Sequence, residues 1–388
     1  MNRNLWLLAI CQGLFLTNNV TFIAINGLVG LNLAPLGWMA TLPVMGYVVG
    51  GALSTGLVAR TQRRFGRKTS FQLGLAVAFV SALLCGYAAY QHNFWLLITA
   101  TVIAGYYNAN AQLYRFAAAE LALPAFREKA VSLVMAGGLL GAVAGPNLAA
   151  GTRNLTNVPF GGAYLALAGV ALLAMALLAF VRFPPPARQA ASGGRPMSEI
   201  MRQPAFIVAA AASALGYGVM NLLMAATPIA MQICSLPFSD VALVLEWHVI
   251  GMFAPGFFTG HLIRRFGTLP IMAVGLALNL LCVAIALSGV DFTQFLAALF
   301  LLGLGWNFLF TGATTLALTA YRPEEKDRAQ GALNFCVFVV LAVSSLTSGV
   351  LVTTQGWTLL NWGSLLPLGL TGLALAWLAL KRWQSQNT

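Results

Sequence analysis

Long apolar stretches alternate with short polar segments along the whole chain. A helix of about 20 apolar residues crosses the hydrocarbon core of a bilayer, because each residue adds about 1.5 Å. The pattern therefore predicts an all-α membrane protein with twelve transmembrane helices. The predicted spans lie near 5–30, 37–59, 70–91, 94–118, 130–152, 161–183, 204–231, 239–263, 270–289, 292–320, 330–352 and 358–381.

The longest polar interruption is PPPARQAASGGRPMSEIMRQ, residues 184–203. Its proline, glycine, serine and arginine content is typical of a linker. We expect an N-terminal six-helix half at 1–183, a cytoplasmic linker at 184–203 and a C-terminal six-helix half at 204–388.

Basic residues gather in alternate connections between the spans. Because cytoplasmic loops carry an excess of lysine and arginine, this distribution predicts that both termini are cytoplasmic. Arg153 is the exception, in a connection predicted to face outward. The basic residues on the predicted cytoplasmic side are Arg3, Arg60, Arg63, Arg64, Arg67, Lys68, Arg127, Lys129, Arg188, Arg195, Arg202, Arg264, Arg265, Arg322, Lys326, Arg328, Lys381 and Arg382.

Composition excludes a soluble globular domain. Apolar residues make up 59% of the chain and charged residues 8%, and the mean hydropathy is +0.82. The net charge of +12 sits in short loops, so it reflects orientation in a membrane and not nucleic-acid binding. The five cysteines show no CxxC spacing and predict no disulfide framework.

Two segments of the first half recur in the second. YVVGGALSTGLVARTQRRFG at 47–66 aligns without gaps with HVIGMFAPGFFTGHLIRRFG at 248–267, and PAFREKA at 124–130 matches PEEKDRA at 323–329. Two related six-helix halves are typical of transporters built from parallel repeats, in which the substrate binds between the halves near the midplane of the membrane.

With these features the chain resembles the major facilitator superfamily over nearly its full length. RRFGRK after the second span is similar to the family's Gly-x-x-x-Asp-Arg-x-Gly-Arg-Arg loop motif, with Arg63 in place of the aspartate. GLLGAVAGP at 138–146 resembles the Gly-Pro motif of the family's antiporters, although Ala149 and Ala150 replace its trailing glycines. The same glycine ladder would also serve plain helix packing.

Candidate chemistry concentrates in spans seven and eight. Met220 and Met224 are four residues apart in one span, and His248 and Met252 are four apart in the next, so each pair shares a helix face. Tyr47 and Gly51 occupy the positions in the first half that correspond to His248 and Met252. The shared scaffold therefore does not require this His–Met pattern.

Thioethers and an imidazole form a soft, neutral ligand set that suits Cu(I) and excludes hard cations. We expect a copper site at Met220, Met224, His248 and Met252 if the two helix faces meet. Methionine pairs also serve as core filler, which is the competing interpretation. Met231 and Cys234 are candidate relay ligands, and Glu246 is a candidate for proton coupling or else a solvated residue at the rim.

The two pairs together resemble one branch of the superfamily, the CcoA-like (CalT) bacterial copper importers. This resemblance implies copper uptake for assembly of a respiratory oxidase, across a bacterial inner membrane. It implies copper as transported substrate with no permanently bound cofactor, and a cytoplasmic copper acceptor as partner. We expect a monomer in the lipid bilayer.

Further polar residues are expected to line the central cavity of a transporter that works by alternating access. Those of the first half could instead recognise an organic substrate. With the Gly-Pro motif at 138–146, this makes a proton-coupled antiporter of small organic molecules or drugs the alternative function. No nucleophile–base arrangement predicts an enzyme. The expected cavity residues are Asn18, Asn19, Tyr107, Asn108, Asn110, Gln112, Trp306 and Asn307.

Overall fold

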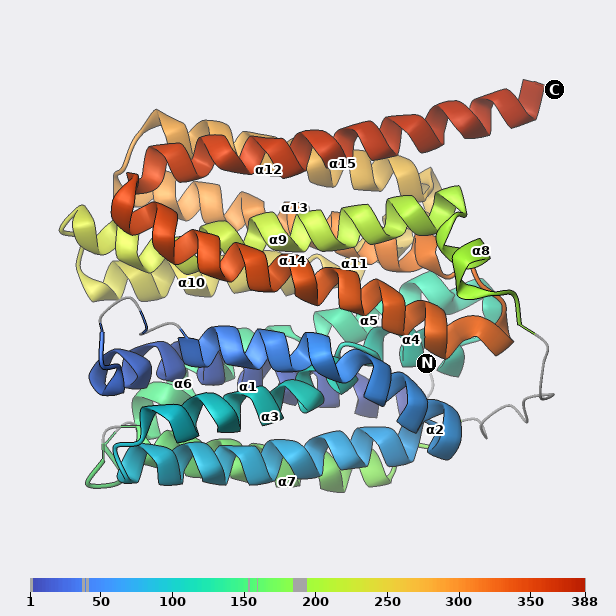
Figure 1. Ribbon diagram of the computed structural model, residues 1–388. Coiled ribbons are helices and arrows are strands. Elements are labelled where there is room, and N and C mark those ends of the chain that lie inside the picture. The colour runs from blue at the N-terminus through green and yellow to red at the C-terminus, as the bar shows by residue number, and fades with distance from the viewer. Residues whose placement is uncertain are drawn as a thin grey trace. The chain divides into compact units, whose positions relative to one another are not determined.

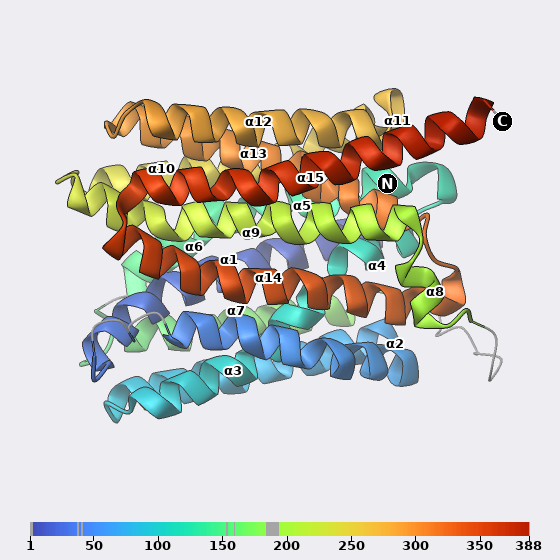
Figure 2. The same cartoon turned by 45° about the horizontal axis from the view of Figure 1, so that its top comes forward.

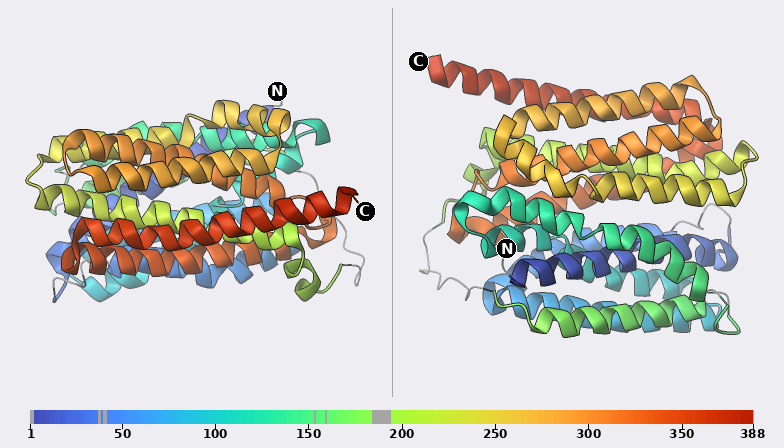
Figure 3. Two further views of the ribbon diagram at one scale, coloured as in Figure 1. Left: turned by 90° about the horizontal axis from the view of Figure 1, so that it is seen from above. Right: turned by 180° about the vertical axis from the view of Figure 1, so that it is seen from behind.

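The computed structural model describes residues 3–36, 39, 42–152, 154–158, 160–183 and 194–387, and regular structure within them is helical (Figure 1). The fold separates into two compact units. Unit 1 comprises Met1–Ala130, Gly137–Arg188 and Gln330–Phe338, and unit 2 comprises Val131–Ala136, Gln189–Ala329 and Val339–Thr388. In each unit, long helices run side by side, as the other views also show (Figures 2 and 3).

The described residues of the first half form a series of α-helices, with a 3₁₀ turn between α4 and α5. These are α1 (Arg3–Leu33), α2 (Leu42–Tyr90), α3 (Phe94–Ala111), α4 (Tyr114–Leu121), η2 (Pro124–Phe126), α5 (Arg127–Ala136), α6 (Leu139–Thr152) and α7 (Gly161–Ala179).

The second half follows a similar order after one short helix in the linker. Its elements are α8 (Met197–Met201), α9 (Pro204–Ile233), α10 (Phe238–Phe253), α11 (Gly256–Phe266), α12 (Thr268–Ser288), α13 (Phe292–Ala317), η3 (Pro323–Glu325), α14 (Lys326–Thr354) and α15 (Gly356–Asn387).

These elements account for the twelve predicted spans. Nine helical segments of the described residues are each long and apolar enough to cross a membrane. One of them, α2, holds two spans joined at a bend, and the pairs α3–α4 and α10–α11 supply the fourth and eighth spans. The predicted all-α fold with twelve transmembrane helices is confirmed.

The internal repeat is confirmed in local structure. Both RRFG segments end in a glycine with left-handed backbone, at φ 80° for Gly66 and φ 90° for Gly267. A side chain would strain that conformation, so glycine permits the tight reversal there. Both proline segments, at Pro124 and Pro323, form a 3₁₀ turn that leads directly into a helix.

Glycines set the closest helix contacts in both units. In unit 1, a Cβ on Gly50 or Gly105 would meet the backbone of the facing helix, α3 or α2. In unit 2, a Cβ on Gly251 would lie 2.7 Å from the Phe300 carbonyl oxygen, and Gly303 faces α10 in the same way. Such close approach of backbones is how membrane helices gain packing energy without a hydrophobic effect between them.

The end of the linker is attached to unit 2. Residues 194–203 include α8, while residues 184–193 of the predicted linker lie outside the described part of the chain, as does Arg153. The guanidinium of Arg195 pairs with the Glu325 carboxylate at 2.7 Å, and Glu325 also accepts from the backbone N–H groups of Arg195 and Arg322. These bonds hold the pKa of the buried Glu325 carboxyl at about 2.

Candidate functional site

His248 is the most unusual polar side chain within the membrane-spanning part of unit 2. It is fully buried on α10, and its Nδ1 lies 2.7 Å from the carbonyl oxygen of Leu299 on α13. Because a carbonyl only accepts, Nδ1 carries the proton and a neutral ring keeps its lone pair on Nε2. Nε2 is buried and has no hydrogen-bond partner within the described residues, so this nitrogen is an unsatisfied acceptor.

The orientation of His248 follows from the packing of α10. A Cβ on Gly303 would press against the His248 carbonyl oxygen and would lie 2.9 Å from the Met252 nitrogen. Asn307 donates to the Met252 carbonyl at 2.6 Å and accepts from Thr259 at 2.7 Å. These bonds satisfy the backbone beside the break between α10 and α11, where Pro255 interrupts the helical ladder. The predicted His–Met face of α10 therefore lies against α13.

The methionines of the predicted copper site differ in burial. Met220 and Met252 are buried, whereas Met224 is partly exposed. Gly216 lies against Leu309 of α13, and Met220 is four residues further along, on the same face of α9. The His248–Met252 pair thus borders α13, and Met220 lies on the face of α9 that includes Gly216.

A layer of aromatic rings gives the relative depth of these residues. Trp306 of α13 contacts Tyr217 of α9 and Phe253 of α10 at ring-centre distances of 5.2 and 5.7 Å. Counting from this layer toward the α9–α10 connection at about 1.5 Å per residue, Met252 lies about 1.5 Å away and Met220 about 4.5 Å. His248 lies about 7.5 Å from the layer and Met224 about 10.5 Å. The four residues therefore spread over about 9 Å of depth.

The aromatic layer itself is a second candidate binding element. Trp306 stacks on Phe310 with ring centres 4.8 Å apart and planes at 18°, and Tyr217 meets Phe310 edge-on at 5.2 Å. Trp306, Phe310 and Phe253 are buried, whereas Tyr217 is partly exposed. The buried rings therefore hold one partly exposed tyrosine in place.

Sequence reasoning selected Trp306 but missed Tyr217, Phe253 and Phe310. Aromatic residues recur throughout the apolar spans, so no pattern marks these three. A usable signal was the pair of Trp306 and Phe310, which are four residues apart and must share a helix face. The buried Nε1 of Trp306 has no hydrogen-bond partner within the described residues, which adds a donor to this element.

The three other candidates of this region lie toward the α9–α10 connection. Met231 is buried, Cys234 is partly exposed and unoxidised, and Glu246 is partly exposed. Within the described residues, no three His, Cys, Asp or Glu side chains gather into a metal site. A copper site would therefore depend on thioethers.

The cavity residues predicted in the first half belong to unit 1. Asn19 donates to the Tyr47 hydroxyl at 3.2 Å, Asn18 is buried, and Gln112 is partly exposed. Asn110 accepts from Ser70 at 2.7 Å, which ties α3 to α2.

Two neighbouring residues complete this cluster in unit 1. Tyr107 packs edge-on against Phe15 at 5.6 Å. Asn108 is buried, and its Oδ1 has no hydrogen-bond partner within the described residues. Asn108 Oδ1 is therefore an unsatisfied buried acceptor of unit 1.

Long apolar helices in two related units are typical of a membrane transporter, and several buried polar groups have no hydrogen-bond partner within the described residues. The chain belongs to the Major Facilitator Superfamily, whose sequence profile matches residues 5–245 and 209–386. It is therefore an integral membrane protein of a transporter family.

Individual proteins are similar to this chain over nearly its whole length. The riboflavin transporter RfnT of Brucella anthropi is 38% identical over 364 residues, which cover 93% of this chain and 92% of RfnT. The human organic anion transporter MFSD10 has a TM-score of 0.74 at 15% identity, covering 96% of this chain and 100% of MFSD10. A bacterial homologue of the iron transporter ferroportin, in its outward-facing state, has a TM-score of 0.71 at 15% identity, covering 99% and 100% of the two chains. The two structures share the fold.

The predicted superfamily is thus confirmed, and the predicted resemblance to the copper importers is not. The residues proposed for copper stay a prediction, as do the orientation of the termini, the monomeric state and the division at 184–203.

Proposed function

We propose that this protein transports riboflavin, or a planar heterocycle of the same chemical class, across a bacterial cytoplasmic membrane. The observation that carries the proposal is the 38% identity to a riboflavin transporter along 93% of the chain. Identity of that extent over a whole transporter includes the spans that hold substrate as well as those that only pack. The relative is a riboflavin transporter of a bacterium, which supports both the substrate class and the membrane.

The aromatic layer of unit 2 suits such a substrate. Flat heterocycles bind by stacking on aromatic side chains, and each such contact contributes about 1–3 kcal/mol in nucleic-acid complexes. Tyr217 is the partly exposed ring, and contacts with Trp306 and Phe310 hold it from behind. A ring that is already fixed loses little conformational freedom when a substrate stacks on it.

His248 adds a polar contact of the right kind. Its Nε2 is an acceptor in the neutral tautomer fixed by Leu299, and riboflavin carries an imide N–H that donates. The buried Trp306 Nε1 is a donor, and the imide is flanked by two carbonyl acceptors. A buried polar group without a partner costs free energy, so a substrate that satisfies it is favoured over one that cannot.

Transport assays test the proposal directly. We would express the protein in a riboflavin-auxotrophic bacterium that lacks its own riboflavin carrier, and measure radioactive riboflavin entry and growth on limiting riboflavin. Everted vesicles made from the same cells detect movement in the other direction. No riboflavin movement in either preparation, at confirmed expression in the membrane, contradicts the proposal.

Tyr217 variants then test the stacking role. We expect Tyr217→Ala to weaken riboflavin transport by about fivefold or more, because about 1–3 kcal/mol of stacking is lost, whereas Tyr217→Phe keeps the ring and retains transport. Phe310→Leu is a matched control for packing behind the tyrosine. Equal transport by the alanine and phenylalanine variants would remove Tyr217 from the site.

Copper import is the second candidate, and one observation favours it. Metal-bound histidines usually donate their second ring N–H to a carbonyl, which fixes the ring for the metal, and His248 makes this bond to Leu299. Copper entry measured in the same cells decides between the two substrates. Copper accumulation that requires His248, with no riboflavin movement, would replace the first proposal by the second.

A further inference from the structure

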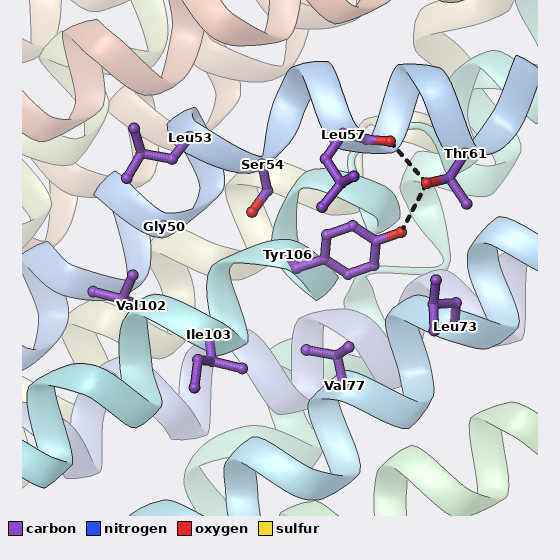
Figure 4. A pocket seen from close by; sticks show the side chains of 10 residues that line it. All are labelled: Gly50, Leu53, Ser54, Leu57, Thr61, Leu73, Val77, Val102, Ile103 and Tyr106. Atoms are coloured by element: carbon purple, nitrogen blue, oxygen red, sulfur yellow. Dashed lines mark hydrogen bonds between the residues drawn. The ribbon is translucent and has the colours of Figure 1, made fainter.

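A groove opens on unit 1 between the two arms of α2 and α3 (Figure 4). Its volume is about 390 Å³. Along the first arm of α2 it extends from Gly50 to Thr61, a distance of roughly 16 Å at 1.5 Å per residue. The lining residues are Gly50, Leu53, Ser54, Leu57, Thr61, Leu73, Val77, Val102, Ile103 and Tyr106.

The groove presents hydrocarbon over most of its length. Leu53 and Leu57 are 73% and 54% exposed, so this face is open to the membrane. The polar atoms at its end are already paired, because Thr61 donates to the Leu57 carbonyl at 2.8 Å and the Tyr106 hydroxyl lies 3.4 Å from the Thr61 oxygen. A long, narrow, apolar cleft within a membrane suits an acyl chain.

Positively charged side chains lie beside the Thr61 end of the groove. Arg60, Arg63 and Arg64 are all exposed. Arg64 is three residues beyond Thr61 and seven beyond Leu57, so it continues the same helix face as the groove. The charge pattern of the whole chain predicts that this end faces the cytoplasm.

Arg67, the next arginine along the chain, differs from these three in burial and in its ion pair. Arg67 is buried and pairs with the Glu120 carboxylate at 2.6 Å. Its charge is therefore balanced inside unit 1. Arg60, Arg63 and Arg64 instead place their charge at the depth of lipid headgroups.

We propose that this groove binds an anionic phospholipid of the cytoplasmic leaflet, with one acyl chain along Leu57, Val77 and Ile103 and the phosphate against Arg60 and Arg64. Basic clusters beside the cytoplasmic ends of membrane helices attract anionic headgroups, and basic pockets between such helices hold them. A zwitterionic lipid fills the groove equally well but gains no net charge attraction. The site is independent of the transported substrate.

Photo-cross-linking of the full-length protein tests the site. The protein would be placed in phosphatidylcholine nanodiscs that contain a minor fraction of phosphatidylglycerol with a diazirine on its acyl chain, and labelled residues would be mapped by mass spectrometry. Phosphatidylcholine with the same diazirine chain is the second arm. We expect phosphatidylglycerol to label Leu73, Val77 and Ile103 several-fold more than phosphatidylcholine does.

Arginine variants separate the headgroup contact from the groove. Each of Arg60→Gln and Arg64→Gln should lower phosphatidylglycerol labelling in the groove roughly fivefold, which corresponds to about 1 kcal/mol for one arginine near an anionic surface. Arg382→Gln, at an exposed position of α15, is the matched control and should leave labelling unchanged. Val77→Trp fills the groove and should remove labelling by both lipids.

Three results would each overturn the proposal. The first is equal labelling of the groove by the two lipids. The second is labelling of the groove no greater than that of Leu165 and Leu172 of α7, which are exposed on another face. The third is an equal loss of phosphatidylglycerol labelling in Arg60→Gln and Arg382→Gln. The first and second need no variant, so they hold even if Val77→Trp fails to fold.

Discussion

Substitution of Gly303 by alanine tests whether close packing of α10 on α13 positions His248. A Cβ at this position would press on the His248 carbonyl oxygen and would lie 2.9 Å from the Met252 nitrogen. Ordinary contact begins near 3.4 Å, so the two helices must separate locally by at least 0.5 Å. Both neighbours are backbone atoms, which cannot move aside as a flexible side chain would.

The separation has a calculable cost. Overpacking of a well-packed interior typically costs about 1–3 kcal/mol, and a gap of 0.5–1 Å loses a quarter to a half of each dispersion contact along the interface. The Leu299–His248 and Asn307–Met252 hydrogen bonds, at 2.7 and 2.6 Å, would lengthen as α10 moves. Against this, alanine favours a helix over glycine by about 0.5–1 kcal/mol.

Gly169→Ala is the matched control, because Gly169 lies in α7 and a Cβ there meets no atom within 4 Å. It should be neutral or slightly stabilising. The helix-propensity gain of alanine is common to both variants, so they should differ by the overpacking cost, about 1–3 kcal/mol in free energy of unfolding. Thermal unfolding of the purified proteins in one detergent, followed by riboflavin uptake, measures both consequences. If Gly303→Ala is as stable and as active as Gly169→Ala, then α10 is not packed on α13 in this way.

Three further outcomes are expected. If the copper interpretation is right, Met220→Leu should abolish copper uptake. Leucine keeps the volume and apolarity of methionine at a loss of stability of about 1.5 kcal/mol or less, but it offers no metal ligand. Copper uptake at the wild-type level in this variant would make Met220 a packing residue. Glu325→Gln should lower thermal stability at neutral pH, since a carboxyl whose pKa is lowered from 4.5 to about 2 by Arg195 stabilises the folded state above pH 4.5. The difference from wild type should shrink as pH falls from 4.5 toward 2, and a difference that does not change with pH would exclude this ion pair as its cause. In a background with the native cysteines replaced by serine, a cysteine at position 156 should react with an impermeant reagent in intact cells and one at position 385 should not; the reverse pattern would invert the predicted topology.

Much of this fold is determined by the sequence because the bilayer imposes a simple physical requirement. A backbone in hydrocarbon must satisfy its own hydrogen bonds, so each apolar stretch of sufficient length becomes a helix. Repetition of RRFG and of the Pro124 and Pro323 segments indicated two related halves, and the same local structures form at both copies. Local sequence suffices here because turns and helix starts depend on a few adjacent residues.

Which neighbour each helix face meets was decided only by tertiary packing. Periodicity shows that His248 and Met252 share a face of α10, but not that this face lies against α13, with Nδ1 bonded to Leu299. All the surrounding spans are comparably apolar, so hydropathy does not distinguish one partner from another. Backbone contact at Gly303 makes the distinction, because only small residues let two helices approach that closely.

The aromatic layer shows the same division. The spacing of four residues between Trp306 and Phe310 implies one helix face, although only Trp306 was selected from the sequence. Tyr217 and Phe253 come from helices far away in the chain. Ring contacts have no signature in a single apolar sequence, because any aromatic residue in a span can face lipid or protein. The chain by itself therefore determined that this is a twelve-helix transporter built from a repeat. The three-dimensional packing of α9, α10 and α13 decided which side chains meet one another, because that depends on contacts between distant segments.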